Sequence, residues 1–424
     1  MMTGKEIYRS MRKRIFDVID AEVLDKLTKQ QLSEQISNAV EVIISKDRIP
    51  VPSLIKADIV KNLCDELTGL GPIQPLMEDE SISDIMVNGP DCIYIERNGL
   101  VDKSDIQFVD EQQLLDAAKR IAARVGRRVD ESVPLCDARL EDGSRVNIVI
   151  PPLAIDGTSI SIRKFRQQKM RLEDLASKGA MSPEMAKLLG IAARCRLNIV
   201  ISGGTGSGKT TLLNALSNYV SERERIITIE DAAELQLQQP HVVRLETRVA
   251  SIEGSGAIGQ RELVINSLRM RPDRIIVGEC RGAEAFEMLQ AMNTGHDGSM
   301  TTTHANSPRD AISRIESMVM MATASLPLEA IRRSIVSAID LVVQVSRLHD
   351  GTRRVTNISE VIGLEGDSVV MEEIFRFRST GHAHEGKIEG VYETAGLMQR
   401  SVLVEKAGFY GYSNEVSNIF RRPE

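Results

Sequence analysis

The pattern of apolar and polar positions divides the chain into stretches of different character. Residues 4–66 carry a helical period that breaks at Ile49–Pro52, which predicts a helical N-terminal region over residues 1–66. One face of this region is formed by Leu27, Leu32, Ile36, Val40 and Ile43. Such an apolar face either docks a neighbouring protein or packs into the local hydrophobic core. We favour the core, because amphipathic helices of globular domains usually bury their apolar face.

After Gly69, short alternating segments replace the helical period. Strands are predicted near residues 85–89, 93–99, 138–140, 145–150 and 159–163, with a helix at 111–125 and turns at 98–99 and 141–144. These elements predict a small α+β domain over residues 67–166. The polar, charged stretch that follows predicts a linker over residues 167–183, which is able to act as a hinge.

Beyond the linker, strands and helices alternate. Strands are predicted at 198–201, 225–229, 274–277 and 299–303, and helices at 210–219, 260–270, 283–292 and 308–321. This alternation predicts a parallel sheet covered on both faces, with its site at the carboxyl ends of the strands. We therefore expect an α/β nucleotide-binding domain over residues 184–365 and a C-terminal segment, residues 366–424, packed on it.

An apolar strand runs directly into the pattern G-x-x-x-x-G-K-T, which is typical of a P-loop. Backbone N–H groups of such a loop surround a phosphate at the start of a helix. We expect Lys209 to reach the β and γ phosphates and the Thr210 hydroxyl to hold magnesium. The expected nucleotide-binding residues are Gly203, Gly204, Thr205, Gly206, Ser207, Gly208, Lys209, Thr210 and Thr211. The pattern predicts ATP and Mg²⁺ as cofactors.

Residues 274–279 form an apolar strand that ends in an acid, the shape of a Walker B element. Gly278 stands where an Asp usually binds magnesium, and Asp273 lies at the wrong end of the strand, so metal contact has to come through water or another acid. We expect Glu279 to orient the attacking water, because a carboxylate at this end of a strand faces the γ-phosphate. The alternative is an acid that caps the next turn.

A second acidic group follows the strand predicted at 225–229. Acids beside a phosphate need a cation, so Glu230, Asp231 and Glu234 are candidates to hold hydrated Mg²⁺ and to position water. The predicted metal-binding residues are Thr210, Glu230 and Asp231, and Glu230 and Glu234 are also predicted to be catalytic. The alternative is an ordinary run of acids at a helix N-terminus.

Two further groups of side chains have open interpretations. His296 and His304 flank the strand at 299–303 and either sense the γ-phosphate or are ordinary core or surface histidines. Arg139, Arg145 and Arg163 lie on strands of the small domain. They are solvated charges, or arginine fingers if that domain folds over a nucleotide of its own or an adjacent subunit.

Composition narrows the function classes. Among the 424 residues the net charge is −7, aromatic residues make up 3% and tryptophan is absent, which argues against nucleic-acid binding. The five cysteines lie far apart without CxxC spacing, as in reduced cytosolic proteins, and offer no zinc motif. No apolar stretch approaches the roughly 20 residues of a membrane span, so we expect a cytoplasmic protein that reaches membranes through partners.

The motifs in this order resemble the type II/type IV secretion ATPase superfamily, and within it the CpaF branch, the motor of Tad (Flp) pili. The resemblance spans roughly residues 60–365, and the combination is more specific than any one motif. It is carried by Gly203–Thr211, Ile226–Glu234, Arg261–Val264, Leu268–Gly282 and Gly295–Asn306, and upstream by Gly69–Ile73, Asp84–Gly89 and Asp142–Asn147.

The resemblance implies a RecA-like P-loop core behind a small, PAS-like α+β domain, in a cytoplasmic homohexamer at the inner face of the inner membrane. It implies ATP bound between the two domains and hydrolysis that drives their rigid-body rotation. It assigns Glu279 as the catalytic glutamate and makes Gly278 a family feature. The remaining implied roles are an acidic box of Glu230, Asp231 and Glu234, a histidine box of His296 and His304, and arginine fingers among Arg139, Arg145 and Arg163.

The implied function is assembly of pili through inner-membrane platform proteins, with pilin handled indirectly and retraction as a further direction. A sibling motor for type IV secretion or conjugation shares this chemistry and differs in cargo. A RecA-like DNA helicase and a nucleotide-gated scaffold that hardly hydrolyses ATP are more distant alternatives.

Overall fold

The computed structural model describes residues 4–18, 28–47, 53–97, 99–165, 170–248, 256–323, 325–382, 386, 388–397 and 401–421. The chain divides into two compact units, Met1–Arg166 and Gln167–Glu424. Residue 166 at the end of the predicted small domain, residues 167–169 at the start of the predicted linker, and Leu27 of the N-terminal apolar face lie outside the described residues.

Three helices begin the first unit. They are α1 (Gly4–Val18), α3 (Lys29–Asp47) and α4 (Ser53–Thr68). Leu32, Ile36 and Val40 from α3 are at most 2% exposed, in a cluster with Met11 of α1 and Leu63 of α4. The apolar face recognised in the sequence is therefore core. Buried Glu66 joins these helices to the rest of the unit, because its carboxylate accepts hydrogen bonds from Tyr8, Arg12 and Gln113.

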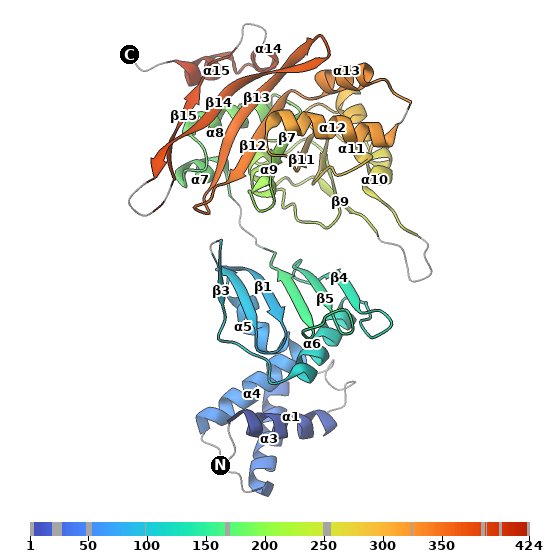
Figure 1. The fold of residues 1–424 in the computed structure, drawn as a ribbon, viewed down its shortest axis with the longest axis vertical. Coiled ribbons are helices and arrows are strands. Elements are labelled where there is room, and N and C mark those ends of the chain that lie inside the picture. Colours follow the sequence, from blue (N-terminus) through green and yellow to red (C-terminus); the bar gives the residue numbers. More distant parts are fainter. Residues whose placement is uncertain are drawn as a thin grey trace. The chain divides into compact units, whose positions relative to one another are not determined.

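The first unit also contains a six-stranded antiparallel sheet of order β3-β2-β1-β6-β5-β4. The strands are β1 (Ile82–Asn88), β2 (Ile93–Arg97), β3 (Leu100–Lys103), β4 (Leu135–Arg139), β5 (Arg145–Val149) and β6 (Ser159–Arg163). The helical elements are η1 (Gly71–Ile73), α5 (Gln74–Glu78) and α6 (Glu111–Arg124). Alternate strand residues share one apolar core with α6, which covers one face of the sheet (Figure 1).

A nine-stranded sheet of order β15-β14-β13-β12-β7-β11-β10-β8-β9 runs through the second unit. The parallel strands are β7 (Ile199–Gly203), β8 (Ile226–Glu230), β9 (Val242–Glu246), β10 (Arg274–Val277), β11 (Met300–Thr303) and β12 (Leu341–Arg347). The antiparallel extension consists of β13 (Arg353–Glu365), β14 (Ser368–His382) and β15 (Ile388–Thr394). The boundary predicted at residue 365 falls at the turn between β13 and β14, inside this sheet.

Helices cover both faces of the large sheet, as the alternating sequence predicts (Figure 1). One face is covered by α7 (Leu172–Ser177), α8 (Pro183–Arg194), α9 (Lys209–Ser217), α14 (Val402–Phe409) and α15 (Ser413–Phe420). The other is covered by α10 (Gln260–Ser267), α11 (Glu284–Asn293), α12 (Pro308–Ala322) and α13 (Leu328–Ala338). Ile199 and Ile201 of β7 face the first layer and Val200 faces the second, which fixes the strand between two cores.

Polar contacts anchor the C-terminal helices to this sheet. Buried Glu360 accepts hydrogen bonds from the Ser401 hydroxyl and the Leu403 N–H at the start of α14, each at 2.9 Å. Lys406 of the same helix pairs with Asp340 at 2.9 Å. Within the described residues, no helix is both long and apolar enough to cross a membrane.

Candidate nucleotide site

The P-loop lies where β7 gives way to α9, and the shape of the backbone requires three of its glycines. A Cβ on Gly203 would collide with the carbonyl oxygen of Val345 on the neighbouring strand β12. Gly206 and Gly208 have φ angles of 68° and 102°, in the left-handed region that favours glycine. The sequence therefore forms a tight loop between strand and helix, with Thr210 and Thr211 half-buried at the start of α9.

Lys209 is buried and folds back over this loop. Its ammonium donates hydrogen bonds to the carbonyls of Gly203 and Gly204 at 3.0 and 2.9 Å, and lies 3.3 Å from His304 Nε2. A buried ammonium beside the backbone of a glycine-rich loop suits a phosphate group, which supplies stronger acceptors than carbonyl oxygens. The donor set therefore fits a nucleotide phosphate.

Glu279 stands between two basic side chains at the end of β10. Its Oε1 lies 2.9 Å from His304 Nε2, and its Oε2 lies 2.7 Å from an Arg281 Nη atom. Burial acts to raise the pKa of Glu279, but the Arg281 hydrogen bond and the nearby positive charges outweigh it and hold the pKa below its usual range. Glu279 is therefore ionised at neutral pH, as a water-orienting carboxylate has to be.

His304 Nε2 is within reach of both Lys209 and Glu279. Burial and the charge of Lys209 lower the pKa of His304, against the opposing effect of Glu279, so the ring is mainly neutral at pH 7. A neutral ring nitrogen either donates or accepts, and therefore serves only one of the two partners at a time. This side chain links the P-loop lysine to the Walker B glutamate.

Glu230 is the most buried member of the acidic group, at 3% exposure. Its Oε2 accepts from the N–H groups of Glu234 and Leu235 at 2.7 and 2.8 Å, which holds the turn after β8. Burial raises the pKa of Glu230 to about 7, although these hydrogen bonds oppose the shift. Asp231 is exposed, with Oδ2 3.6 Å from Arg281, and Glu234 is half-buried.

One observation suits a cation beside these acids. Glu230 Oε1 is buried and has no hydrogen-bond partner among the described residues, so an acceptor stands ready for a metal-bound water. Within the same residues, no three His, Cys, Asp or Glu side chains converge into a metal-binding group. These groups therefore fit Mg²⁺ held mainly through phosphate and water, with the Thr210 hydroxyl and Glu230 as the protein oxygens that would contribute.

The two histidines lie at opposite ends of β11. His304 follows the strand and faces the P-loop, whereas His296 precedes it and lies 3.2 Å from the carbonyl oxygen of Ala291. In the same loop, the Gly298 carbonyl accepts a hydrogen bond from Arg274, the first residue of β10. The loop that contains His296 therefore lies at the amino ends of the parallel strands. The structure therefore brings His304, and not His296, together with Lys209 of the same chain.

The predicted arginines form one row on the sheet of the first unit. Arg139 is paired with Arg145, Arg145 with Arg163, and Arg163 with Asp84 across four adjacent strands. All three arginines point away from the apolar core, because the neighbouring Val146 and Ile162 point into it. Arg163 lies 3.8 Å from Asp84 Oδ1, which offsets part of the positive charge of this row. A row of guanidinium groups also suits an anion.

Two basic residues near the P-loop were absent from the sequence prediction. Arg353, the first residue of β13, donates a hydrogen bond to the Gly206 carbonyl at 2.8 Å. Arg281 contacts Glu279 and Asp231. The position of Arg281 two residues after the Walker B glutamate was a usable signal, whereas Arg353 is placed by the antiparallel β12–β13 pairing, which the alternation of strands and helices does not reveal.

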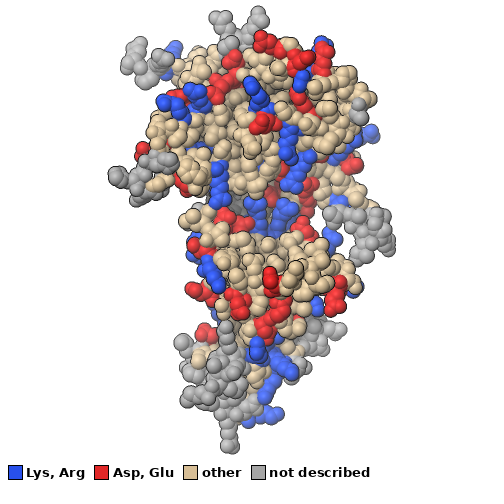
Figure 2. Space-filling model, in the orientation of Figure 1, with Lys and Arg blue, Asp and Glu red and all other residues tan. Residues whose placement is uncertain are grey.

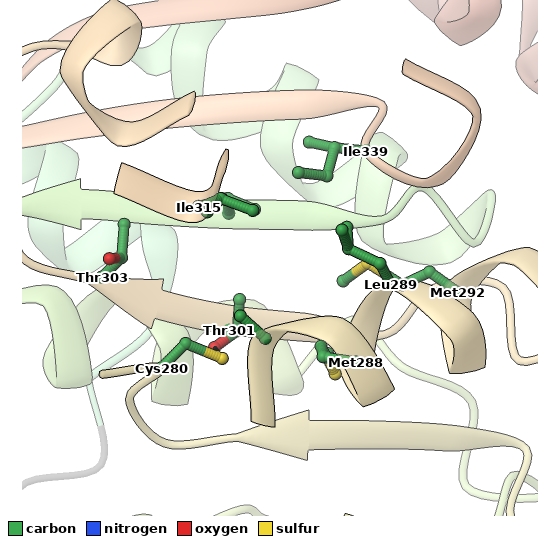
Figure 3. Close-up of a pocket in the computed structure, with 10 residues that line it drawn as sticks. Cys280, Met288, Leu289, Met292, Thr301, Thr303, Ile315 and Ile339 are labelled. Carbon is green, nitrogen blue, oxygen red and sulfur yellow. Dashed lines mark hydrogen bonds between the residues drawn. The ribbon is translucent and has the colours of Figure 1, made fainter. Parts of the chain in front are cut away.

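A small internal cavity lies behind this edge, between β7, β11 and helices α11 and α12 (Figure 3). Its lining is mostly apolar, with Cys280, Met288, Leu289 and Ile315 among the residues that face it. No P-loop residue contributes to it, so this cavity is a packing defect and not the nucleotide site. On the face of the second unit in Figure 2, acidic and basic side chains are mixed.

Comparison with known proteins finds relatives that match most of this chain. A Mycobacterium tuberculosis (strain ATCC 25618 / H37Rv) protein, provisionally named a conjugal transfer protein, is 39% identical over 307 residues, which cover 71% of this chain and 87% of the relative. The type IV secretion system protein VirB11 of Bartonella henselae is 33% identical over 333 residues, which cover 69% of this chain and 92% of the relative.

Among solved structures, the sulphate complex of the VirB11 ATPase from the Brucella suis type IV secretion system is 31% identical, with a TM-score of 0.37. That match covers 68% of this chain and 94% of the other. The family model described as "Type II/IV secretion system protein" matches residues 66–406, which include the six-stranded sheet of the first unit and most of the second unit. The chain therefore belongs to the type II/IV secretion system protein family.

Proposed function

We propose that the chain binds ATP at its P-loop and hydrolyses it. The observation that carries this proposal is the order of four neighbouring parallel strands, β7-β11-β10-β8. Their carboxyl ends lead to Lys209, His304, Glu279 and Glu230, in that spatial order. A phosphate-binding lysine and a water-orienting carboxylate thus converge at one sheet edge, although the residues lie far apart in sequence.

Each group has a role in phosphoryl transfer to water. Lys209 offsets charge on the β and γ phosphates, and Glu279 aligns the attacking water. The hydroxyl of Thr210, with Glu230, Asp231 and Glu234 through water, is suited to hold Mg²⁺, which when bound neutralises phosphate charge. Gly203 to Thr211 surround the phosphates. His304 links the lysine to the glutamate, and His296 has a structural role in its own subunit.

In this proposal, the row of Arg139, Arg145 and Arg163 supplies further positive charge to the phosphoryl group that is transferred. Transition-state charge on the transferred phosphoryl group is stabilised by arginines that another domain or subunit presents. The row on the small sheet offers three such side chains, of which Arg139 and Arg163 are exposed and Arg145 is half-buried. We propose that at least one of them reaches a nucleotide when subunits assemble into a homohexamer.

We further propose that this ATPase drives assembly, and also retraction, of Tad/Flp-type pili from the cytoplasmic face of the inner membrane. Support comes from the CpaF-like run Arg269–Glu279 together with the small domain and its Asp84–Gly89 motif. The motor would move inner-membrane platform proteins and handle pilin indirectly. The two moving lobes would be the domains at residues 67–166 and 184–365. The helices of residues 1–66 would move with the first of these domains.

A type IV secretion or conjugation ATPase is the second candidate, because relatives of that name are 33% identical across 69% of the chain. Neighbouring genes distinguish the two. A pilin gene with two polytopic membrane proteins supports pilus assembly, whereas a relaxase gene supports conjugation.

Phosphate release by the purified protein tests the shared chemistry. We expect Mg²⁺-dependent release from ATP that DNA does not stimulate. Release that rises with DNA and falls steeply with salt would instead support a helicase. Nucleotide binding without release would leave only a scaffold.

A further inference from the structure

Arg281 is the side chain that contacts both acidic elements of the site. Its guanidinium lies 2.7 Å from Glu279 Oε2 and 3.6 Å from Asp231 Oδ2. These acids follow the neighbouring parallel strands β10 and β8. One planar group with several donors therefore joins the Walker B glutamate to the acidic group.

The backbone beneath Arg281 is held from two sides. Buried Glu284 accepts hydrogen bonds from the N–H groups of Arg281 and Gly282 through one oxygen, at 2.5 and 2.7 Å. Cys280 N–H donates to the carbonyl of Thr302 on β11 at 2.8 Å. The loop that carries Arg281 is thus fixed to α11 and to the sheet, so the direction of its side chain is set by the fold.

This arrangement gives the two oxygens of Glu279 different surroundings. Oε2 is bound by Arg281, whereas Oε1 lies 2.9 Å from His304, on the side that leads to Lys209. Without Arg281 the carboxylate could rotate about its last bond, because it is 20% exposed. The guanidinium therefore keeps one defined oxygen directed toward the phosphate side.

We propose that Arg281 is a positioning residue that orients the carboxylate of Glu279 for catalysis and ties it to Asp231. This inference rests on the proposed ATP hydrolysis. Arg281 is 58% exposed, and exposed ion pairs contribute little to folding stability. Its removal should change turnover and leave the fold intact, which separates this role from a structural one.

The test compares steady-state ATP hydrolysis by full-length wild type, Arg281→Gln and Arg281→Lys. Because misplacement of a reacting group by about 1 Å can cost about 100-fold in rate, we expect Arg281→Gln to lower kcat about 10- to 100-fold with little change in KM. Arg281→Lys keeps the charge and should restore part of the rate. Arg333→Gln is the matched control, since Arg333 forms an exposed pair with Glu329 on α13.

A second comparison tests whether Arg281 acts through Glu279. In a Glu279→Gln background, the added Arg281→Gln change should lower kcat no further, because the group to be positioned is already lost. A further loss of the same size would overturn the inference, as would wild-type kcat in Arg281→Gln or an effect on KM alone. An inactive wild type would instead overturn the proposed hydrolysis itself and this inference with it, which distinguishes the two failures.

Discussion

The side chain of Glu230 lies where a side chain at position 278 would have to begin. A Cβ built on Gly278 would lie 2.9 Å from Glu230 Cγ, closer than real Cβ atoms approach their neighbours. Gly278 N–H also donates to the carbonyl of Ile229, directly before Glu230, at 2.8 Å. The glycine before the Walker B glutamate thus provides the space that buries an acid of the neighbouring strand.

Replacing Gly278 with alanine should therefore disturb the acidic turn. Overpacking of a buried site usually costs about 1–3 kcal/mol, and here Glu230 has to shift, which disturbs the hydrogen bonds that it accepts from the N–H groups of Glu234 and Leu235. We expect reduced stability in urea titrations and reduced ATP hydrolysis. Gly282→Ala is the control, because its Cβ would meet only Glu284 at an ordinary 3.4 Å. Equal behaviour of the two variants would contradict this relationship.

Lys209→Met should weaken nucleotide binding. Hydrogen bonds to charged groups contribute about 1.5–3 kcal/mol, so the dissociation constant for ATP should rise about 10- to 100-fold in calorimetry. Lys187→Met on the exposed side of α8 should bind like wild type. Unchanged affinity of Lys209→Met would show that nucleotide binds elsewhere.

The pH dependence of stability should contain a contribution from Glu360. Burial raises its pKa, although the hydrogen bonds from Leu403 and Ser401 oppose the shift. The folded state therefore holds this proton more tightly than the unfolded chain does, so its stabilising contribution is full below the ordinary pKa and declines as pH rises through the raised value.

Urea midpoints of the ligand-free protein, measured from pH 4 to 8, test this expectation. The difference in stability between Glu360→Gln and wild type should grow in favour of the variant as pH rises, because glutamine keeps an acceptor for Ser401 and Leu403 without ionising. A difference that is constant with pH would contradict the raised pKa.

The arginine row makes a prediction about assembly. Alanine at the arginine that reaches a nucleotide should lower kcat by at least about 100-fold, whereas Arg127→Ala, also exposed in the first unit, should have no effect. Arg139, Arg145 and Arg163 are changed singly to find it. If that arginine acts on an adjacent subunit, mixing its inactive variant with Lys209→Met subunits should restore activity, whereas mixtures without activity indicate action within one subunit.

The sequence was sufficient for the parts of the fold that depend on local pattern. The Walker B strand was predicted at residues 274–277 and lies at Arg274–Val277, and the P-loop lies between a strand and a helix as its motif requires. The first strand of the β4–β5 pair was placed at 138–140 but runs over Leu135–Arg139. In this strand the strongly apolar Leu135 is 54% exposed and the smaller Cys136 is buried, so the apolar pattern does not follow burial.

Other features depend on contacts between distant segments. The space beside Gly278 is filled by a side chain 48 positions away in sequence, and the arginine row depends on the register of three antiparallel strands. Strand direction alone could have separated the histidines, since only a residue that follows a parallel strand reaches the phosphate edge. That argument selects His304 and leaves His296 at the opposite edge of the sheet.

Single-turnover phosphate release by Glu279→Gln, measured alongside ATP binding, tests the central claim most directly. If Glu279 aligns the attacking water, the variant should bind ATP as tightly as wild type while release slows about 100- to 10,000-fold. Release at the wild-type rate from bound ATP would contradict the account.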